Sequence, residues 1–143
     1  KQKSDNYFLV MKKGDDFMEA VLEGFKRSGF RSATISGIGA LEEVELGYCD
    51  REKGDYNHRT LDGVYELVNV TGNVTSKDGQ PFVHAHVALG DPEYTLRGGH
   101  LFKAKVAVTG ELELRRVDVS LVRRTQSGGV LALIAPDFDE PNL

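Results

Sequence analysis

The beginning of the chain has a pattern typical of one strand followed by one helix. Residues 7–12 form a short apolar run that predicts the first strand. Apolar residues then recur at helical spacing, which predicts an amphipathic helix capped by Asp15 or Asp16 and ended by Gly29. The apolar stripe of this helix consists of Phe17, Val21, Leu22 and Phe25. We expect this to be the only convincing amphipathic helix.

After the helix the pattern favours strands. Polar and apolar residues alternate over 44–48, and denser apolar runs cover 64–70 and 82–89. Asp78-Gly79, between the two dense runs, is a strong hairpin signal. The other expected elements are strands at 33–37, 106–121 and 130–134, a turn at 37–39, a break near 115–116 and a charged loop at 50–60. One helix and six to eight strands predict an α+β domain with a largely antiparallel sheet packed on the helix.

The length and composition fit one globular domain. The chain has 143 residues, of which 40% are hydrophobic and 28% are charged. We interpret 1–143 as a single domain with its core at about 7–134 and a polar tail at 136–143. The net charge of -4 argues against direct nucleic-acid binding, because neutralising phosphates needs clustered Lys and Arg.

Cysteine content and hydropathy exclude further classes. Cys49 is the single cysteine, which excludes an internal disulfide framework and a multi-cysteine metal site within one chain. No apolar run approaches the roughly 20 residues that span a bilayer. The first residues also show no signal-peptide pattern. We therefore expect a cytoplasmic protein without membrane contact.

Three of the four histidines lie within residues 84–100. His84 and His86 share a predicted strand, and side chains two positions apart in a strand point to the same face. The residues that alternate with them are apolar, so the opposite face is the core face. His100 follows Gly98-Gly99, which permits close backbone approach and a sharp turn.

Three converging neutral imidazoles are a suitable ligand set for zinc. Three protein ligands leave a fourth position for water or a small molecule, which is the catalytic type of site. Imidazoles also bind nickel, copper and iron. Without a metal, the same histidines would form a polar sheet face. His58, in the expected charged loop, is interpreted as a surface residue.

Glu66 interrupts an otherwise apolar strand run. A carboxylate in such a place lies on a polar face, forms a buried ion pair, or acts as a general base near a metal. The pattern leaves these three roles open.

Five segments follow one another in an order that resembles the plants-and-prokaryotes-conserved (PPC) domain. They are SGIGAL at 36–41, VELGY at 44–48, YELVNVTGNV at 65–74, DGQPFVHAH at 78–86 and GGHL at 98–101. The resemblance covers nearly the whole chain. It implies an antiparallel sheet packed on a helix, assembly into trimers, and correspondence of the family's three histidines to His84, His86 and His100 and of its strand glutamate to Glu66.

The chain is similar to the stand-alone prokaryotic members of this family. Plant members carry an AT-hook, a basic Arg-Gly-Arg element for the DNA minor groove, and this chain has no Arg-Gly-Arg. We expect a homotrimer that binds zinc, or another divalent transition metal, through His84, His86 and His100. Glu66 is the candidate catalytic base, and a small molecule is a candidate ligand at the metal.

The sequence leaves open whether the protein is an enzyme. One alternative is a non-enzymatic oligomerisation or interaction module, in which the metal would be structural and its coordination closed. Another is a DNA-associated regulator, by analogy with the plant relatives alone.

Overall fold

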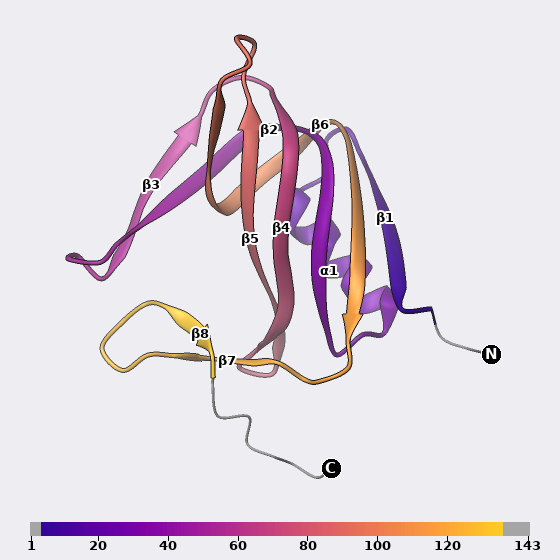
Figure 1. Cartoon of the computed structure of the whole chain (residues 1–143), viewed down its shortest axis with the longest axis vertical. Coiled ribbons are helices and arrows are strands. Elements are labelled where there is room, and N and C mark those ends of the chain that lie inside the picture. The colour runs from indigo at the N-terminus through magenta and orange to yellow at the C-terminus, as the bar shows by residue number, and fades with distance from the viewer. Residues whose placement is uncertain (1–3, 136–143) are drawn as a thin grey trace.

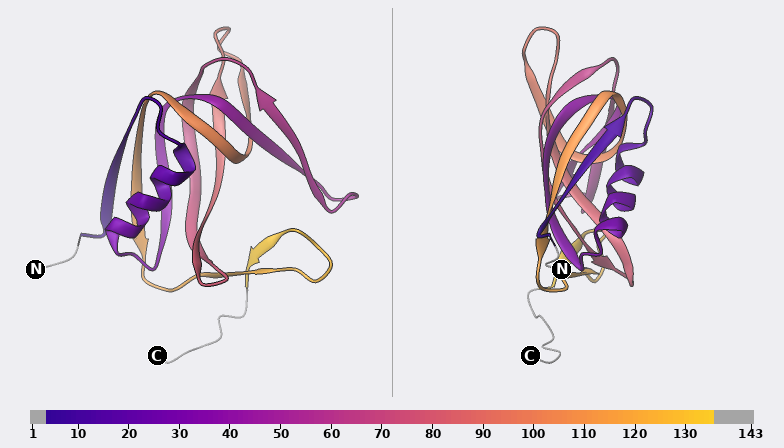
Figure 2. Two further views of the ribbon diagram at one scale, coloured as in Figure 1. Left: turned by 180° about the vertical axis from the view of Figure 1, so that it is seen from behind. Right: turned by 90° about the vertical axis from the view of Figure 1, so that its right-hand side faces the viewer.

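In the computed structural model, which describes residues 4–135, one helix packs against one strongly curved sheet of eight strands (Figure 1). The reverse and side views show the helix lying along one face of that sheet (Figure 2). All strand pairings are antiparallel except a short parallel one between β4 and β7. The α+β class expected from the sequence is confirmed, whereas the polar tail expected at 136–143 lies outside the described residues.

The chain order is one strand, the helix and seven further strands. The elements are β1 (Asn6–Lys12), α1 (Phe17–Ser28), β2 (Ser32–Asp50), β3 (Asp55–Leu61), β4 (Tyr65–Lys77), β5 (Gln80–Gly90), β6 (Leu96–Val117), β7 (Val122–Thr125) and β8 (Ala132–Ile134). Within residues 4–135, no helix is long and apolar enough to cross a membrane.

The helix α1 begins and ends where the sequence predicts. The Asp16 carboxylate accepts a hydrogen bond of 3.0 Å from a backbone N–H of the first turn. Gly29 ends the helix with a left-handed φ of 70°, a conformation that glycine adopts without steric cost. Phe17, Val21 and Phe25 are buried in the core. Burying each such side chain contributes about 1.5–3 kcal/mol to folding.

Two long strands close the sheet on itself. The first half of β2 pairs with β4 and its second half with β3, while β6 pairs with β1, β2 and, at its own start, β5. Because β4 also pairs with β5, the strands β2, β4, β5 and β6 form a closed circuit. The core lies between this sheet and α1, where helix residues join strand residues in one buried cluster.

The turn expected at 37–39 is wrong, because β2 continues through it. The pairing with β4 shifts by one residue between Gly37 and Gly39, which is a bulge within the strand. A Cβ at Gly37 would lie 2.4 Å from the carbonyl oxygen of Glu111, and one at Gly39 2.3 Å from that of Thr109. These glycines therefore allow the backbones of two strands to approach closely, and they do not turn the chain.

The loop expected at 50–60 is wrong for most of its length. Residues 55–61 form β3, whose backbone pairs with the second half of β2. Most of the side chains of β3 are exposed, so this strand carries no alternating apolar pattern.

The expectations for β6 are partly correct. Gly98-Gly99 lies within the strand, so the expected sharp turn is wrong. The expected close approach of the backbone is confirmed, because a Cβ at Gly98 would lie 2.3 Å from the carbonyl oxygen of Val87. The strand also continues past 115–116 to Val117, so the break falls at 118–121. The Asp78-Gly79 hairpin is confirmed, with positive φ at both residues.

Candidate metal centre

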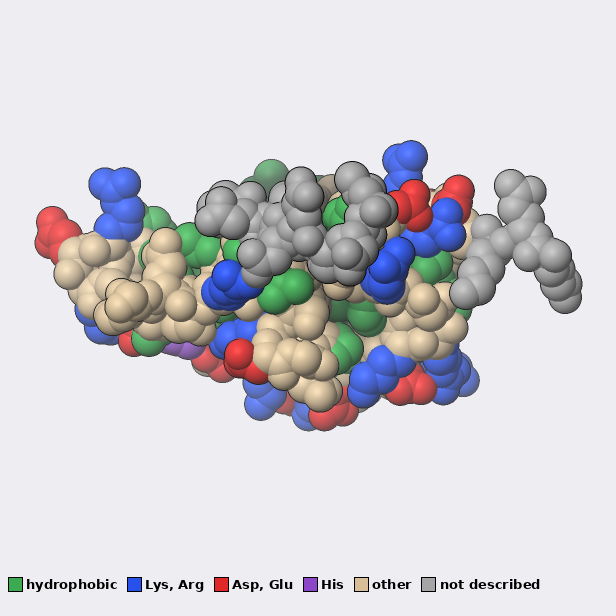
Figure 3. Space-filling view, turned by 90° about the horizontal axis from the view of Figure 1, so that it is seen from below, with side chains coloured by type: hydrophobic (Ala, Val, Ile, Leu, Met, Phe, Trp, Pro, Cys, Tyr) green, Lys and Arg blue, Asp and Glu red, His purple; other side chains and the backbone are tan. Residues whose placement is uncertain are grey.

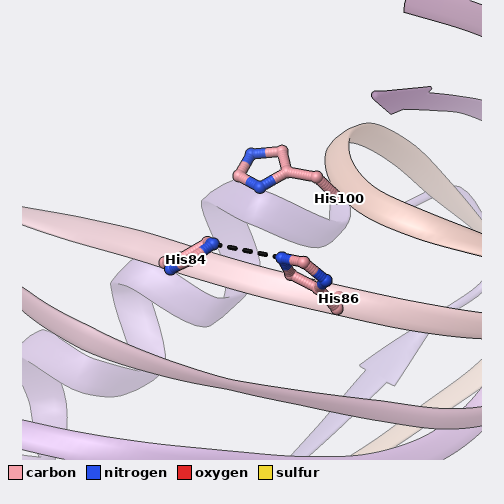
Figure 4. Close-up of side chains that lie close together, drawn as sticks. All are labelled: His84, His86 and His100. Atoms are coloured by element: carbon pink, nitrogen blue, oxygen red, sulfur yellow. Dashed lines mark hydrogen bonds between the residues drawn. The ribbon is translucent and has the colours of Figure 1, made fainter. Parts of the chain in front are cut away.

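Three histidines converge where β5 meets the start of β6 (Figure 4). His84 and His86 project from β5 to one face, and His100 of β6 lies directly opposite His86. The alternating positions of β5 point into the core, which leaves the imidazoles on the outer face of the sheet. These core positions are Val83, Ala85, Val87 and Leu89.

The imidazole nitrogens lie close to the spacing that a metal requires. Nε2 of His84 is 3.2 Å from Nε2 of His86, and one nitrogen from each of the three rings lies within 4.8 Å of the others. Tetrahedral zinc with Zn–N bonds of about 2.0–2.1 Å needs nitrogens about 3.3 Å apart. The first pair already meets this value, and His100 needs only a small movement. Within residues 4–135, no other group of three His, Cys, Asp or Glu side chains converges in this way.

Burial keeps two of the imidazoles neutral. Burial, with smaller effects from Arg123 and His86, lowers the pKa of His84 to about 4. Burial, with smaller effects from the neighbouring histidines and Arg123, likewise lowers the pKa of His100 to about 4. A neutral imidazole carries the lone pair that a metal ligand needs.

One nitrogen at the centre lacks a partner. Nδ1 of His100 is buried, and nothing in the described part of the chain hydrogen-bonds to it. Leaving such a nitrogen unsatisfied costs about 1–3 kcal/mol. A bound metal or ligand would remove this cost, so the residues present fit an imidazole-bound metal.

Arg123 of β7 contacts His84, and its side chain is buried, with 5% of the residue exposed. Its guanidinium donates hydrogen bonds to Oγ1 of Thr75 at 3.0 Å, the carbonyl oxygen of Ala132 at 2.8 Å and Oδ1 of Asn73 at 2.8 Å. Its Nη2 also lies 3.1 Å from Nδ1 of His84. Arg123 was not predicted from the sequence, because nothing in the local pattern separates it from the neighbouring arginine.

Arg123 determines which nitrogen of His84 carries the proton. A guanidinium can only donate, so Nδ1 of His84 accepts in this contact. The neutral ring therefore has its proton on Nε2, which donates to Nε2 of His86. A metal at Nε2 of His84 must displace this proton, as metal binding to histidine generally does.

A pocket of about 280 Å³ opens beside His84 and His100. Its wall contains aromatic rings, side chains of residues 130–133 between β7 and β8, and a few charged groups. The rings of His100 and Phe102 have centroids 4.5 Å apart, and the ring of Tyr56 lies 4.8 Å from that of His100. The charged groups of the wall are Asp55, Lys77 and Arg123.

His58 lies at the rim of this pocket and not among the converging imidazoles. Its side chain is 46% exposed, which agrees with the surface position expected from the sequence. Nδ1 of His58 is 2.7 Å from Oε1 of Glu45, and its ring stacks on that of Phe102 with centroids 4.3 Å apart.

Glu66 is not beside the histidines within one chain. It pairs with Gly90, four positions beyond His86 along β5, which is about 13 Å at the rise of a strand. The side chain is exposed and borders a shallow depression together with Ile38, Val68 and Val108. The role of Glu66 as a catalytic base stays a prediction.

The family comparison matches residues 1–118 to the Plants and Prokaryotes Conserved (PCC) domain, the family abbreviated PPC above. The chain belongs to the PCC domain family. The histidines of the metal centre lie inside the matched segment, whereas β7, β8 and Arg123 lie beyond it. A comparison with curated proteins finds no match.

Solved structures show the same fold. A PPC protein from Pyrococcus horikoshii is 35% identical with a TM-score of 0.84, and the match covers 98% of this chain and 94% of that one. A metal-containing protein from Archaeoglobus fulgidus is 31% identical with a TM-score of 0.83, covering 94% of this PCC chain and 95% of the other. A candidate DNA-binding protein from Bacteroides thetaiotaomicron is 26% identical with a TM-score of 0.87, covering 98% and 96%.

Proposed function

We propose that this PCC protein binds one zinc ion per chain through His84, His86 and His100. The observation that carries the proposal is the convergence of three imidazoles, two of them kept neutral by burial and one with an unpartnered buried nitrogen. The similar protein from Archaeoglobus fulgidus is described as metal-containing, which supports it. A ligand set of three imidazoles is one that zinc sites commonly use, and nickel, copper and iron also bind imidazoles.

The pocket beside the imidazoles supports an open coordination site and not a closed structural one. It reaches His84 and His100 from the side of Tyr56 and Phe102, so a small molecule can approach the metal there. A zinc ion with such an open position polarises a bound carbonyl or lowers the pKa of a bound water. In this proposal the chain holds the ion, and burial keeps His84 and His100 neutral.

We further propose that the protein is a homotrimer. Five exposed apolar side chains from β1, β2, β4 and β6 lie on the outer face of the sheet, and we call them the apolar sheet patch. Their exposed fractions run from 49% to 66%. Apolar groups gathered in this way mark contact surfaces, and a closed assembly of copies is the occupant that the PPC resemblance implies. The patch consists of Phe8, Val10, Ile38, Val68 and Val108.

DNA association is the weaker alternative for this chain. A structural neighbour is described as a candidate DNA-binding protein, but this chain has a net charge of -4. On the face shown in Figure 3, Lys and Arg side chains are interspersed with Asp and Glu, so that face offers phosphates no uniform positive field.

A cytoplasmic location stays a prediction from the sequence.

Elemental analysis tests the metal proposal. Untagged protein purified without chelator should contain about one zinc per chain, and His100→Ala should lose it. His58→Ala is the matched control, because it removes an imidazole of the same region that lies outside the converging group. Wild-type protein that contains no metal and takes none up from added zinc would overturn the proposal.

A further inference from the structure

Arg123 is a buried cation that meets no carboxylate in the described part of the chain. It is 5% exposed, and it takes part in no ion pair among residues 4–135. Its acceptors are a hydroxyl, an amide oxygen, a carbonyl oxygen and an imidazole nitrogen, all of them neutral. A buried charge normally needs an opposite charge nearby, because it has lost its hydration.

Among residues 4–135, the lining of the pocket offers little negative charge to balance this cation. Lys77 also lines it, with Nζ 5.4 Å from the centroid of the Phe82 ring. Asp55 is the one acidic residue of the lining, and its Oδ1 already accepts a hydrogen bond of 2.7 Å from the backbone N–H of Tyr56. A divalent metal on the neutral imidazoles would add two further positive charges. The pocket is therefore suited to an anion.

Arg123 retains a donor for such an anion. A guanidinium has five N–H groups, and contacts within residues 4–135 use four of them, which leaves one on Nη1. A metal on Nε2 of His84 makes a second donor available. The proton of the neutral ring then lies on Nδ1, which can no longer accept from Nη2 of Arg123.

We propose that this pocket binds a small carboxylate with an apolar body, whose carboxylate group pairs with Arg123. The body packs against the rings of Phe82 and Phe102 and the side chain of Leu131. A guanidinium fork matches a planar carboxylate, and the apolar wall favours an organic acid over a fully hydrated inorganic anion. The volume of about 280 Å³ limits the ligand to roughly the size of benzoate.

The proposal also predicts that metal and carboxylate binding are coupled through His84, and this part rests on the proposed zinc site. Zinc adds positive charge and releases a donor of Arg123, so each ligand should raise the affinity for the other. By thermodynamic linkage the two factors must be equal. We expect a factor of at least about ten.

Calorimetric titration of the full chain tests both statements. The probes are benzoate, its neutral analogue benzamide and inorganic phosphate, each added to metal-free and to zinc-loaded protein. We expect benzoate to bind at least about tenfold more tightly than benzamide or phosphate, and more tightly with zinc than without. Competition with a chelator should show zinc affinity rising in benzoate by the same factor.

Variants at Arg123 identify the group responsible. Arg123→Lys keeps the charge but not the fork, and Arg123→Met removes both; each should weaken benzoate binding at least about tenfold. If Arg123→Met fails to fold by circular dichroism, Arg123→Lys and Lys77→Met still report on the pocket charge. Arg124→Met is the matched control from the opposite face of the same strand and should bind like wild type.

The outcomes separate the two proposals. Zinc uptake with equal binding of benzoate and benzamide overturns the carboxylate pocket and leaves the zinc site in place. Benzoate binding that depends on Arg123 in protein that takes up no zinc supports the pocket and overturns the zinc site and the coupling. Tighter binding of phosphate than of benzoate, or binding unaffected by both Arg123 variants, also overturns the pocket.

Discussion

The histidine pocket and the apolar sheet patch lie on the same outer face of the sheet, yet they have opposite characters. Directly paired residues of antiparallel strands share a face, and a row of such pairs connects the two regions. The pocket holds nitrogens and a guanidinium sheltered from water, whereas the patch holds exposed apolar groups beside the carboxylate of Glu66. The row runs Phe8, Glu113, Ser36, Thr71, His86 and His100.

The difference between the two regions comes from what covers the face. At the histidine end, residues of β3 and of the chain between β7 and β8 supply walls of the pocket. Figure 1 shows the β2–β3 arm and the β7–β8 hairpin projecting to the same side of β5. Their contacts bury polar groups and depress the pKa values of His84 and His100. At the other end nothing in the described residues covers the patch, so its apolar side chains remain available to a second copy. One sheet face can therefore serve chemistry at one end and assembly at the other.

The largest change in zinc affinity is expected from His86→Ala. Removing one of three ligands should weaken zinc binding at least about 100-fold, because a metal ligand contributes more than the 10- to 100-fold of its supporting contacts. Competition with a chromogenic chelator measures the affinity. The oligomer mass should not change. A variant that keeps wild-type zinc affinity would exclude His86 as a ligand.

The next largest effect is expected from Ile38→Asp in the apolar sheet patch. A carboxylate placed in a buried contact loses about 1.5–3 kcal/mol of apolar burial per subunit and adds a charge desolvation cost. Trimers should therefore dissociate to monomers, as measured by sedimentation or light scattering, while zinc content is retained. Tyr48→Asp, at an exposed apolar position of the same strand outside the patch, should remain trimeric. Equal masses for both variants would contradict the assignment of the patch.

The stability of metal-free protein should fall as the pH falls below neutrality. The pKa of His84 and of His100 is about 4 in the folded chain and 6.5 in the unfolded chain, so the unfolded state binds more protons between these values. The free energy of unfolding is therefore highest above pH 6.5 and decreases toward pH 4. After allowance for partial solvent exposure, each histidine accounts for about 1–2 kcal/mol.

Urea unfolding at pH 7 and pH 5 measures this dependence. His100→Gln removes one of the two titrating groups and should flatten the profile. A wild-type stability that is the same at both pH values would show that the imidazoles titrate normally and that the pocket does not desolvate them.

The smallest effect is expected from Glu66→Gln. Glu66 pairs with Gly90, which lies about 13 Å along β5 from His86, so zinc affinity should change by less than about twofold. The chelator competition used for His86→Ala measures it. A loss of tenfold or more would contradict the separation of Glu66 from the histidine pocket, because Glu66 would then have to reach the metal of a neighbouring subunit.

Much of this site follows from the sequence because β5 alternates regularly. Four apolar positions fill the core, so the two histidines between them must share the outer face. The helix and the Asp78-Gly79 hairpin were equally predictable, since capping residues and turn glycines act locally.

Other features depend on partners that are distant in the chain. The sequence 55–61 shows no alternation because most of its side chains are exposed, and only pairing with β2 makes it a strand. In β7 the apolar Val122 is 41% exposed while Arg123 is buried, which reverses the usual preference. That reversal depends on acceptors from two other strands, Asn73 and Thr75 of β4 and Ala132 of β8.

The pairing of β6 has a consequence for the order in which the protein assembles. The three histidines lie within residues 84–100, in a local β5–β6 hairpin, and such hairpins form in about 1–10 μs. The pairing of Asn6 with Arg115 joins two residues that are far apart in the sequence. It must therefore close a long loop, and it forms more slowly. The three candidate ligands can thus meet before the sheet is complete, and if they bind zinc as proposed, zinc present during synthesis would bias the chain toward its native register.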